Sequence, residues 1–344
     1  MSTPIGNTTA HVVSGVVTDL AGPPDDDNPV ASGSDPTPGD PTATPLVTLE
    51  ALARQAGRGF TPIRNGFVQR RLRTGKFVGS TLGQLVHERR RRALLAYLLL
   101  LMASQFLDKS SAPLEAKVWA RALSPRSPEP AWPDAAMTPI WAMLDAGPPR
   151  LITKERQARR VKITPRKESG RGEYTRPRPD QNPSDEGELY FALPDAFWLE
   201  DWHNKLSLPG VAVLLILLAG TVTRDETWLS PERAPEWYGI SEKTMRNGLE
   251  DLRRHGLLDS REEWVTAALS GIGKTKKVHY RLHDPFSRAA RLELQDTTRA
   301  EARKRSVAKR SPRRARGPAA AGIEAAPATT AGNANHSSAH GDDQ

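Results

Sequence analysis

The sequence predicts a mainly α-helical protein with small β wings, arranged as two successive units between disordered termini. Three observations support this fold class. Apolar residues recur mainly with helical spacing, short extended segments follow each group of helices, and the whole order occurs twice along the chain. Only 38% of the 344 residues are hydrophobic, and 26 glycines and 29 prolines interrupt them, so ordered parts alternate with parts that cannot form a core.

Both ends of the chain are predicted to lack a packed core. Residues 1–50 hold seven acidic residues and no Lys or Arg, and they are rich in Pro, Gly, Ser and Thr. Such a composition buries too little apolar surface to offset chain entropy. Residues 51–79 are basic and interrupted by glycine, which predicts a partly ordered basic arm. Residues 287–344 are predicted to form a tail that is first basic and then disordered.

The first predicted unit spans residues 80–198. Ser80 has the residue type of a helix N-cap, and Gly147 with two following prolines ends the last helix. The run at 93–107 is apolar on all sides, so this part of its helix is expected to be buried. The predicted elements are helices over 81–106, 114–123 and 134–146, then strands over 151–164 and 189–193 that form a hairpin across a long loop.

The second predicted unit spans residues 199–286 and repeats this order. Ser230–Pro231 and Ser241 are typical helix starts, and Gly256 is a typical helix end. The predicted elements are helices over 208–219, 231–238 and 242–255, a short extended piece at 228–229, and strands over 264–269 and 277–282. The two units also end alike, with Tyr190, Leu193, Asp195 and Phe197 in the first and Tyr280, Leu282, Asp284 and Phe286 in the second.

Charge is distributed unevenly along the chain. The formal net charge is +9, and residues 51–92 hold eleven Lys and Arg against one acid, Glu88. Such asymmetry favours a polyanionic partner for the basic segments, with charge that only promotes solubility as the alternative. The apolar runs at 93–107 and 210–220 are shorter than the roughly 20 residues that a membrane-spanning helix needs, so no membrane partner is expected.

Several chemistries are excluded or disfavoured. The chain has no cysteine, which excludes disulfides, thiolate catalysis and zinc fingers. The segment Ala268–Thr275 resembles an incomplete phosphate loop, but it lacks the first glycine and precedes a predicted strand instead of a helix. Histidines form no metal-binding helix pair, and no Gly-x-Ser-x-Gly nucleophile motif occurs. We therefore predict no enzymatic activity, no catalytic residue, no metal and no cofactor.

The most informative segment is 239–258. Met245, Leu249 and Leu252 recur at i, i+4 and i+7, which predicts one buried stripe of a helix. The opposite side of this helix presents Lys243, Arg246, Asn247 and Glu250. Gly248 interrupts the helix at an expected cost of about 0.5–1 kcal/mol relative to alanine.

The order of these features resembles that of the winged-helix family of bacterial DNA-binding proteins. The matching features are the turn before Ser241-x-x-Thr244-Met245, then Leu249-x-x-Leu252, Gly256-Leu257-Leu258 and a following wing, and they cover about residues 208–284. The resemblance implies binding of double-stranded DNA. Two such units in tandem are similar to plasmid replication initiators. Because winged-helix proteins often pair on palindromes, a homodimer is also implied, although no heptad seam is evident.

The resemblance assigns roles to individual residues of the second unit. Lys243, Arg246 and Asn247 would face the major groove, where Arg and Asn recognise guanine and adenine edges. Ser241 and Thr244 would bond a phosphate or the helix start. Lys274, Lys276 and Lys277 lie at the wing and would meet phosphate or the minor groove.

In the first unit the expected DNA-binding residues lie in the wing. Residues 154–178 hold ten bases and three acids, whereas the helix over 134–146 has no Lys or Arg. A basic hairpin broken by glycine suits contact with phosphates, and a solvated loop is the alternative. The candidates are Arg159, Arg160, Lys162, Arg166, Lys167 and Arg171.

Three functions stay open. The first is a transcriptional regulator and the second a replication initiator of a plasmid or mobile element, either one in the cytoplasm and associated with the nucleoid. The third is a winged-helix scaffold for protein partners. This last interpretation is favoured by residues 195–285, which hold twelve bases and fourteen acids, and by Glu232, Glu236 and Glu242, which would lie near DNA.

Overall fold

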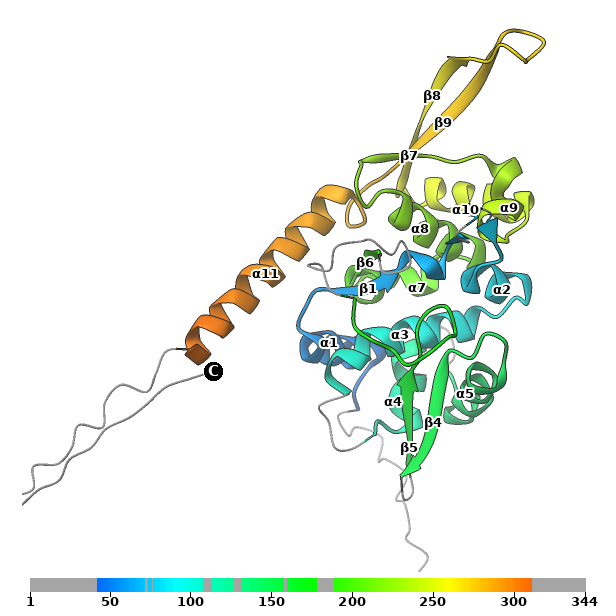
Figure 1. The fold of residues 1–344 in the computed structure, drawn as a ribbon. Helices are drawn as coiled ribbons and strands as arrows, with labels where there is room; N and C mark the ends of the chain where they lie inside the picture. Colours follow the sequence, from blue (N-terminus) through cyan, green and yellow to red (C-terminus); the bar gives the residue numbers. More distant parts are fainter. Residues whose placement is uncertain are drawn as a thin grey trace, which may run out of the picture. The chain divides into compact units, whose positions relative to one another are not determined.

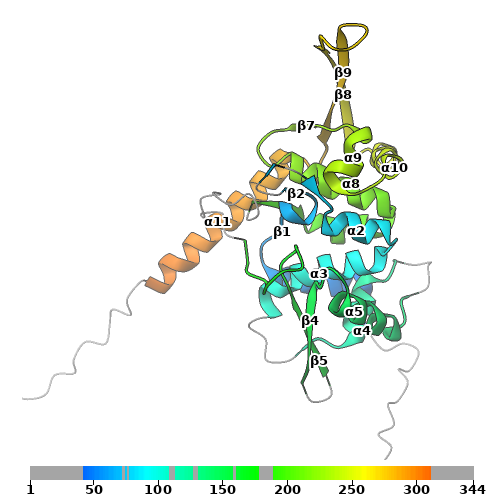
Figure 2. The same ribbon diagram turned by 45° about the vertical axis from the view of Figure 1, so that its right-hand side comes forward.

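The computed structural model describes residues 42–71, 74–75, 77–107, 113–126, 131–157, 160–177 and 189–310. Within these ranges the chain is mostly helical, with small antiparallel sheets (Figures 1 and 2). The described residues from 43 onward form one compact unit. No helix in the described ranges combines the length and the hydrophobicity that crossing a bilayer would require. The expected disorder of residues 1–41 and 311–344 concerns residues outside these ranges.

The first part of the compact unit runs to β6. Its elements are α1 (Pro45–Ala56), β1 (Phe60–Arg64), η1 (Asn65–Phe67), β2 (Arg70–Arg71), β3 (Phe77–Val78), α2 (Thr81–His87), α3 (Arg91–Leu107), α4 (Ala116–Leu123), η2 (Asp134–Ala136), α5 (Met137–Ala146), β4 (Ile152–Gln157), β5 (Arg160–Pro165) and β6 (Tyr190–Pro194). We call α3, α4, α5, β4 and β5 the first helix–hairpin group.

The second part contains the remaining elements. They are α6 (Ala196–Leu199), α7 (Trp202–Lys205), α8 (Leu208–Gly220), β7 (Glu226–Trp228), η4 (Pro231–Arg233), α9 (Ala234–Tyr238), α10 (Glu242–Arg254), β8 (Leu258–Thr266), β9 (Lys274–Leu282) and α11 (Arg288–Arg310). We call α8, β7, α9, α10, β8 and β9 the second helix–hairpin group. Its helices lie close to their predicted bounds.

The N-terminal elements correct two expectations about the start of the chain. Helix α1 begins at Pro45, inside the segment predicted to be disordered, because Thr44 caps it and Leu49 and Leu52 are buried. The predicted basic arm over 51–79 includes β1, in which all five residues are buried. The composition of the whole segments concealed these elements, because acidic residues before α1 and basic residues after β1 dominate their segments.

The β1–β6 pair corrects the predicted hairpin of the first unit. Strand β6 pairs antiparallel with β1, with Ile63 opposite Phe191, and not with the segment 151–164. That segment folds on itself instead, as β4 and β5 pair with Ile152 opposite Pro165. The β1–β6 pair lies between α3 and α8 (Figures 1 and 2), and both helices contact it. Distant pairing of this kind leaves no local mark in the sequence.

The long helix predicted over 81–106 is divided in two. Helix α2 ends at His87 and α3 begins at Arg91, and Arg89 between them has a left-handed backbone with φ of 54°. The break lets the start of α2 pack on the end of α9, where the Ser80 hydroxyl donates to the Tyr238 carbonyl at 2.7 Å. Helix α3 is buried from Ala93 to Gln105, as its uniformly apolar sequence predicted.

Candidate nucleic-acid interface

Helix α10 has the predicted bounds and presents the predicted side to solvent. Lys243, Arg246 and Asn247 are exposed, whereas Met245 and Leu249 are buried. The Ser241 hydroxyl caps the helix by accepting the Thr244 N–H at 3.1 Å, and the two hydroxyl oxygens lie 2.8 Å apart. Of the two roles expected for Ser241 and Thr244, the structure contains the bond to the helix start.

Gly248 sets how closely α10 approaches α8. A Cβ at this position would lie 2.4 Å from both the Pro209 carbonyl oxygen and Val213 Cγ2. Gly248 lowers the helix propensity of α10, but it allows a close contact between α10 and α8 that a residue with a Cβ would prevent. Asp251 fixes the same contact, because its Oδ2 accepts the Ser207 N–H at 2.8 Å and the Ser207 hydroxyl at 2.7 Å.

Arg246 is exposed, yet two acids hold its guanidinium. Its Nη2 lies 2.6 Å from Glu232 Oε1 and 2.7 Å from Glu242 Oε1. The hydrogen bond that Arg246 donates to Glu242 and the charges of both acids raise the pKa of Arg246 above its ordinary value. Binding an anion at Arg246 therefore requires exchange with these carboxylates. Among the described residues no acid forms an ion pair with Lys243, and its exposed ammonium is available to solvent.

The sheet of the second group has the order β7-β9-β8 and extends as a long hairpin away from the helices (Figure 1). The three predicted lysines lie on β9. Lys274 Nζ stacks 4.8 Å from the Trp264 ring centroid, Lys277 Nζ stacks 5.5 Å from that of Trp228, and Lys276 pairs with Glu262. Aromatic rings and one acid thus orient these ammonium groups on the hairpin surface.

The tip of this hairpin was missed by sequence reasoning. The predicted strand over 264–269 is wrong at its end, because β8 stops at Thr266 and Leu269 lies in the connecting turn. Trp264, Leu269 and Ile272 are exposed, at 57%, 104% and 69% of their full accessible areas. The sequence does contain a signal for this tip, because three large apolar residues surround a glycine turn and no predicted helix is placed to cover them.

The first helix–hairpin group separates its predicted bases into two places. Arg160 and Lys162 lie on β5, and Arg160 Nη2 pairs with Glu115 Oε1 at 2.8 Å. The backbone of Arg166 forms an isolated antiparallel β-bridge with that of Glu173 in the turn that follows the hairpin. Lys167 and Arg171 belong to this same turn, and Arg159 lies outside the described residues.

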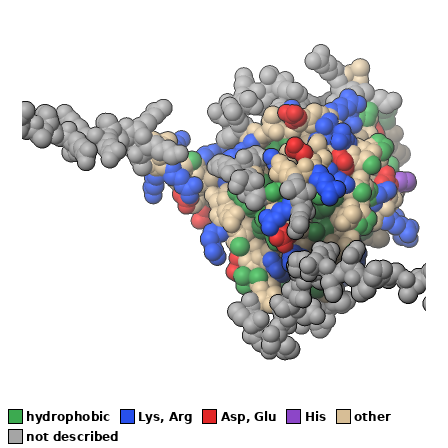
Figure 3. Space-filling model, turned by 90° about the horizontal axis from the view of Figure 1, so that it is seen from below, with side chains coloured by type: hydrophobic (Ala, Val, Ile, Leu, Met, Phe, Trp, Pro, Cys, Tyr) green, Lys and Arg blue, Asp and Glu red, His purple; other side chains and the backbone are tan. Residues whose placement is uncertain are grey.

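The turn after β5 is anchored by a buried ion pair. Glu168 is fully buried, and its Oε2 lies 2.9 Å from Arg64 Nη1 of β1. Burial raises the pKa of Glu168 from its usual range, whereas the charge of Arg64 opposes that rise. The predicted bases around this anchor are therefore held at a turn and do not continue the β4–β5 hairpin. Figure 3 shows, on the face seen from below, Lys and Arg side chains in separate groups with hydrophobic and acidic side chains between them.

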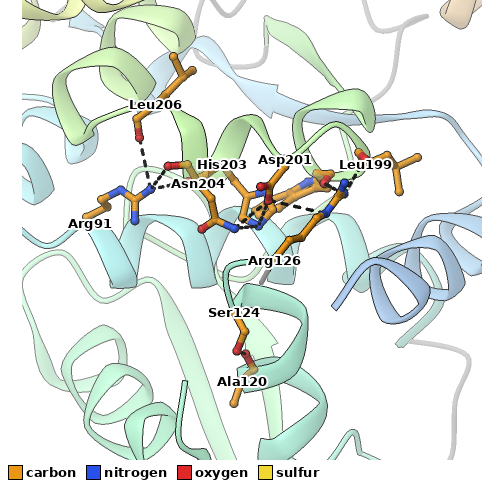
Figure 4. Close-up of polar contacts among 10 residues, drawn as sticks. Arg91, Ala120, Ser124, Arg126, Leu199, Asp201, His203, Asn204 and Leu206 are labelled. Atoms are coloured by element: carbon orange, nitrogen blue, oxygen red, sulfur yellow. Dashed lines mark hydrogen bonds and ion pairs between the residues drawn. The ribbon is translucent and has the colours of Figure 1, made fainter. Parts of the chain in front are cut away.

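The segment between the two groups is fixed by two arginines (Figure 4). Arg91 Nη2 donates to the His203 carbonyl at 2.6 Å, and Arg126 Nη2 donates to the Leu199 carbonyl at 2.6 Å. His203 is buried beside Asp201, and burial lowers its pKa to about 4. Because these contacts tie α6 and α7 to α3 and to the segment after α4, the two helix–hairpin groups are joined through partly buried polar contacts as well as through the core.

Comparisons with known proteins do not assign this chain to a family. No protein-family model matches the chain, and no curated protein or solved structure is significantly similar to it. Among the described residues, no group of three or more His, Asp or Glu side chains is arranged to hold a metal ion.

Proposed function

We propose that this chain binds double-stranded DNA without catalysing a reaction, through a winged-helix fold of residues 208–282. One observation carries the proposal. The second group has the order α8-β7-α9-α10-β8-β9 with sheet order β7-β9-β8, and it exposes a capped helix followed by a lysine-bearing hairpin. An α-helix fits the major groove, and a projecting hairpin reaches the neighbouring backbone.

The exposed side of α10 supplies the contacts to base edges. Lys243 and Asn247 stand on the solvent side of its first two turns, and Asn is suited to bidentate contact with adenine. Arg246 contacts DNA by giving up its ion pairs with Glu232 and Glu242 for a guanine edge or a phosphate. Lys274 and Lys276 of β9 meet the phosphates beside the groove.

The first group supports a tandem arrangement. It has the order α3-α4-α5-β4-β5, and its hairpin carries Arg160 and Lys162. Helix α5 buries Met137 and Trp141 and carries no base, so any contact of this group with DNA comes from the hairpin and is independent of sequence.

The test is duplex affinity as a function of salt. Binding of the full chain to a labelled duplex should weaken steeply from 50 to 200 mM salt, because phosphate neutralisation releases counterions. Lys243→Ala should weaken binding and lower the salt slope by about 1 if this lysine meets a phosphate. Lys205→Ala, a matched control on α7, should bind like the wild type. Salt-independent binding, or an effect equal for both variants, would contradict the proposal.

A protein-binding scaffold is the second candidate, and the exposed apolar tip of the hairpin favours it. Leu269→Ser/Ile272→Ser separates the two functions. Duplex affinity should survive this change if DNA is the ligand of α10, and recovery of a protein partner should be lost if the tip is the contact. Sequencing of bound genomic DNA then distinguishes a transcriptional regulator from a replication initiator. Bound promoters are expected for a regulator, and bound origin repeats are expected for an initiator.

A further inference from the structure

A cavity of about 770 Å³ lies between α1, the junction of β6 with α6, and the first turns of α11. Apolar side chains make much of its wall, among them Ala53, Leu199 and Leu294. Its volume falls within the range of pockets that enclose a small organic molecule. The proposed DNA contacts on α10 and β9 use none of its residues.

The charge around this cavity is opposite to that of the whole chain. Glu50, Glu200 and Glu293 are exposed acids at its edge, and Arg54 is the one base among its lining residues. A chain of formal charge +9 thus surrounds this space with an excess of carboxylates. Such a field attracts a cation and repels an anion.

Asp195 adds a buried carboxylate to the same lining. It is 6% exposed, and its Oδ1 accepts no hydrogen bond from the described part of the chain. The other two buried acids of that part have partners, since Glu168 pairs with Arg64 and Asp251 accepts from Ser207. Burial without a partner raises the pKa of Asp195 to about 7.

Helix capping does not account for Asp195. Asp284 has the corresponding place after β9, and its carboxylate accepts the Ser287 hydroxyl at the start of the next helix. Asp195 also precedes a helix, α6, yet its side chain caps no N–H there. A buried carboxylate without a partner is costly unless a positive group joins it.

We propose that this cavity binds an organic cation, a molecule with an apolar body and one amine or amidinium group that pairs with Asp195. The body packs on Leu199 and Leu294, and the acids at the edge favour its charge. The wall from α11 includes Leu294 and Thr297, and the neighbouring Thr298 hydroxyl donates to the Arg58 carbonyl at 2.7 Å. The ligand therefore contacts α1 and α11 together.

The probe is 4-aminobenzamidine, which fluoresces more strongly in an apolar site. The full chain should bind one equivalent saturably, and Asp195→Asn should weaken binding at least tenfold because a charge-assisted hydrogen bond is lost. Asp296→Asn removes an acid of α11 outside the cavity and should bind like the wild type. Benzamide, the neutral analogue, should not compete.

A folding control keeps the outcome decisive. Asp195→Asn should melt at the same temperature as the wild type or higher, since it removes an unpaired buried carboxylate. If that variant does not fold, Glu50→Gln/Glu293→Gln changes only exposed residues and should weaken the probe by a few fold. Absence of saturable binding by the wild type, or unchanged binding in the folded variants, would overturn the proposal.

Discussion

The two helix–hairpin groups each place three α-helices before a hairpin, but they stabilise their hairpins in different ways. In the second group β7 adds a third strand to β9, with Thr227 opposite Tyr280. In the first group β4 and β5 stand as a pair, and the chain after β5 is anchored by Glu168 on Arg64. A backbone ladder tolerates side-chain changes, whereas a buried ion pair depends on both partners.

The two groups also differ in the side chains that their last helices expose. Helix α10 exposes Lys243, Arg246 and Asn247, whereas α5 exposes uncharged residues such as Thr138 and Ala142. Similar arrangements of helices and a hairpin therefore expose different side chains. Of the residues proposed to contact DNA, those on a helix belong to the second group, whereas those of the first group lie on its hairpin.

The largest effect is expected from breaking the buried ion pair that anchors the turn after β5. Arg64→Ala leaves Glu168 buried without its cation and should lower the free energy of unfolding by about 3–5 kcal/mol. Urea denaturation measures this loss. Because the variant raises the folded-state pKa of Glu168 further, the loss should shrink as pH falls and the carboxyl is protonated in both states. Glu168→Gln in the same variant should restore part of the stability.

The junction between the groups should be sensitive to acid. The folded-state pKa of His203 is about 4, below its ordinary value of 6.5, so stability is fully present above pH 6.5 and falls as pH drops toward 4. His203 should account for a loss of about 2 kcal/mol between pH 7 and pH 5. His203→Gln should remove that part of the pH dependence, whereas His87→Gln, at an exposed position, should leave it unchanged.

The second group should respond to crowding between α8 and α10. Gly248→Ala places a methyl group 2.4 Å from the Pro209 carbonyl and should cost about 1–3 kcal/mol. Gly79→Ala is the matched control, since a Cβ there meets nothing within 4 Å. Equal thermal stability of the two variants would show that the helix contact adjusts without cost.

The acids beside Arg246 should limit DNA affinity. Glu232→Gln/Glu242→Gln releases the guanidinium and removes two negative charges, so duplex affinity should rise by roughly tenfold at low salt. Electrophoretic mobility shift over a salt series measures it. Glu155→Gln/Glu173→Gln removes the same charge from the first group and should raise affinity less. The reverse order would assign the main contact to the first group.

The smallest effect concerns the exposed pair of the first hairpin. Arg160→Ala removes its contact with Glu115 and should change stability by less than about 1 kcal/mol, because exposed ion pairs contribute little. Its effect on duplex affinity should be equal for all sequences, as expected of a phosphate contact. Discrimination between sequences that changes in this variant would contradict the division of roles between the groups.

Much of the second group was predictable from local sequence. Ser241, the apolar stripe of α10 and Gly256 each report on a few neighbouring residues, so caps and periodicity place this helix within a residue. The predicted residues on its exposed side are indeed exposed. The pairing of Arg246 with Glu232 was not predicted, because it joins residues of different helices.

Local sequence accounts for the capped helices, their glycine ends, the apolar α3 and α8, and the placement of charge along the chain. The folded chain shows in addition that β6 pairs with β1, that α1 belongs to the core, and that Asp195 Oδ1 is buried without a hydrogen-bond partner among the described residues. The physical reason is the range of the interactions. Caps and periodicity act within a turn or two, whereas strand pairing, burial and ion pairs depend on segments brought together only by the folded chain.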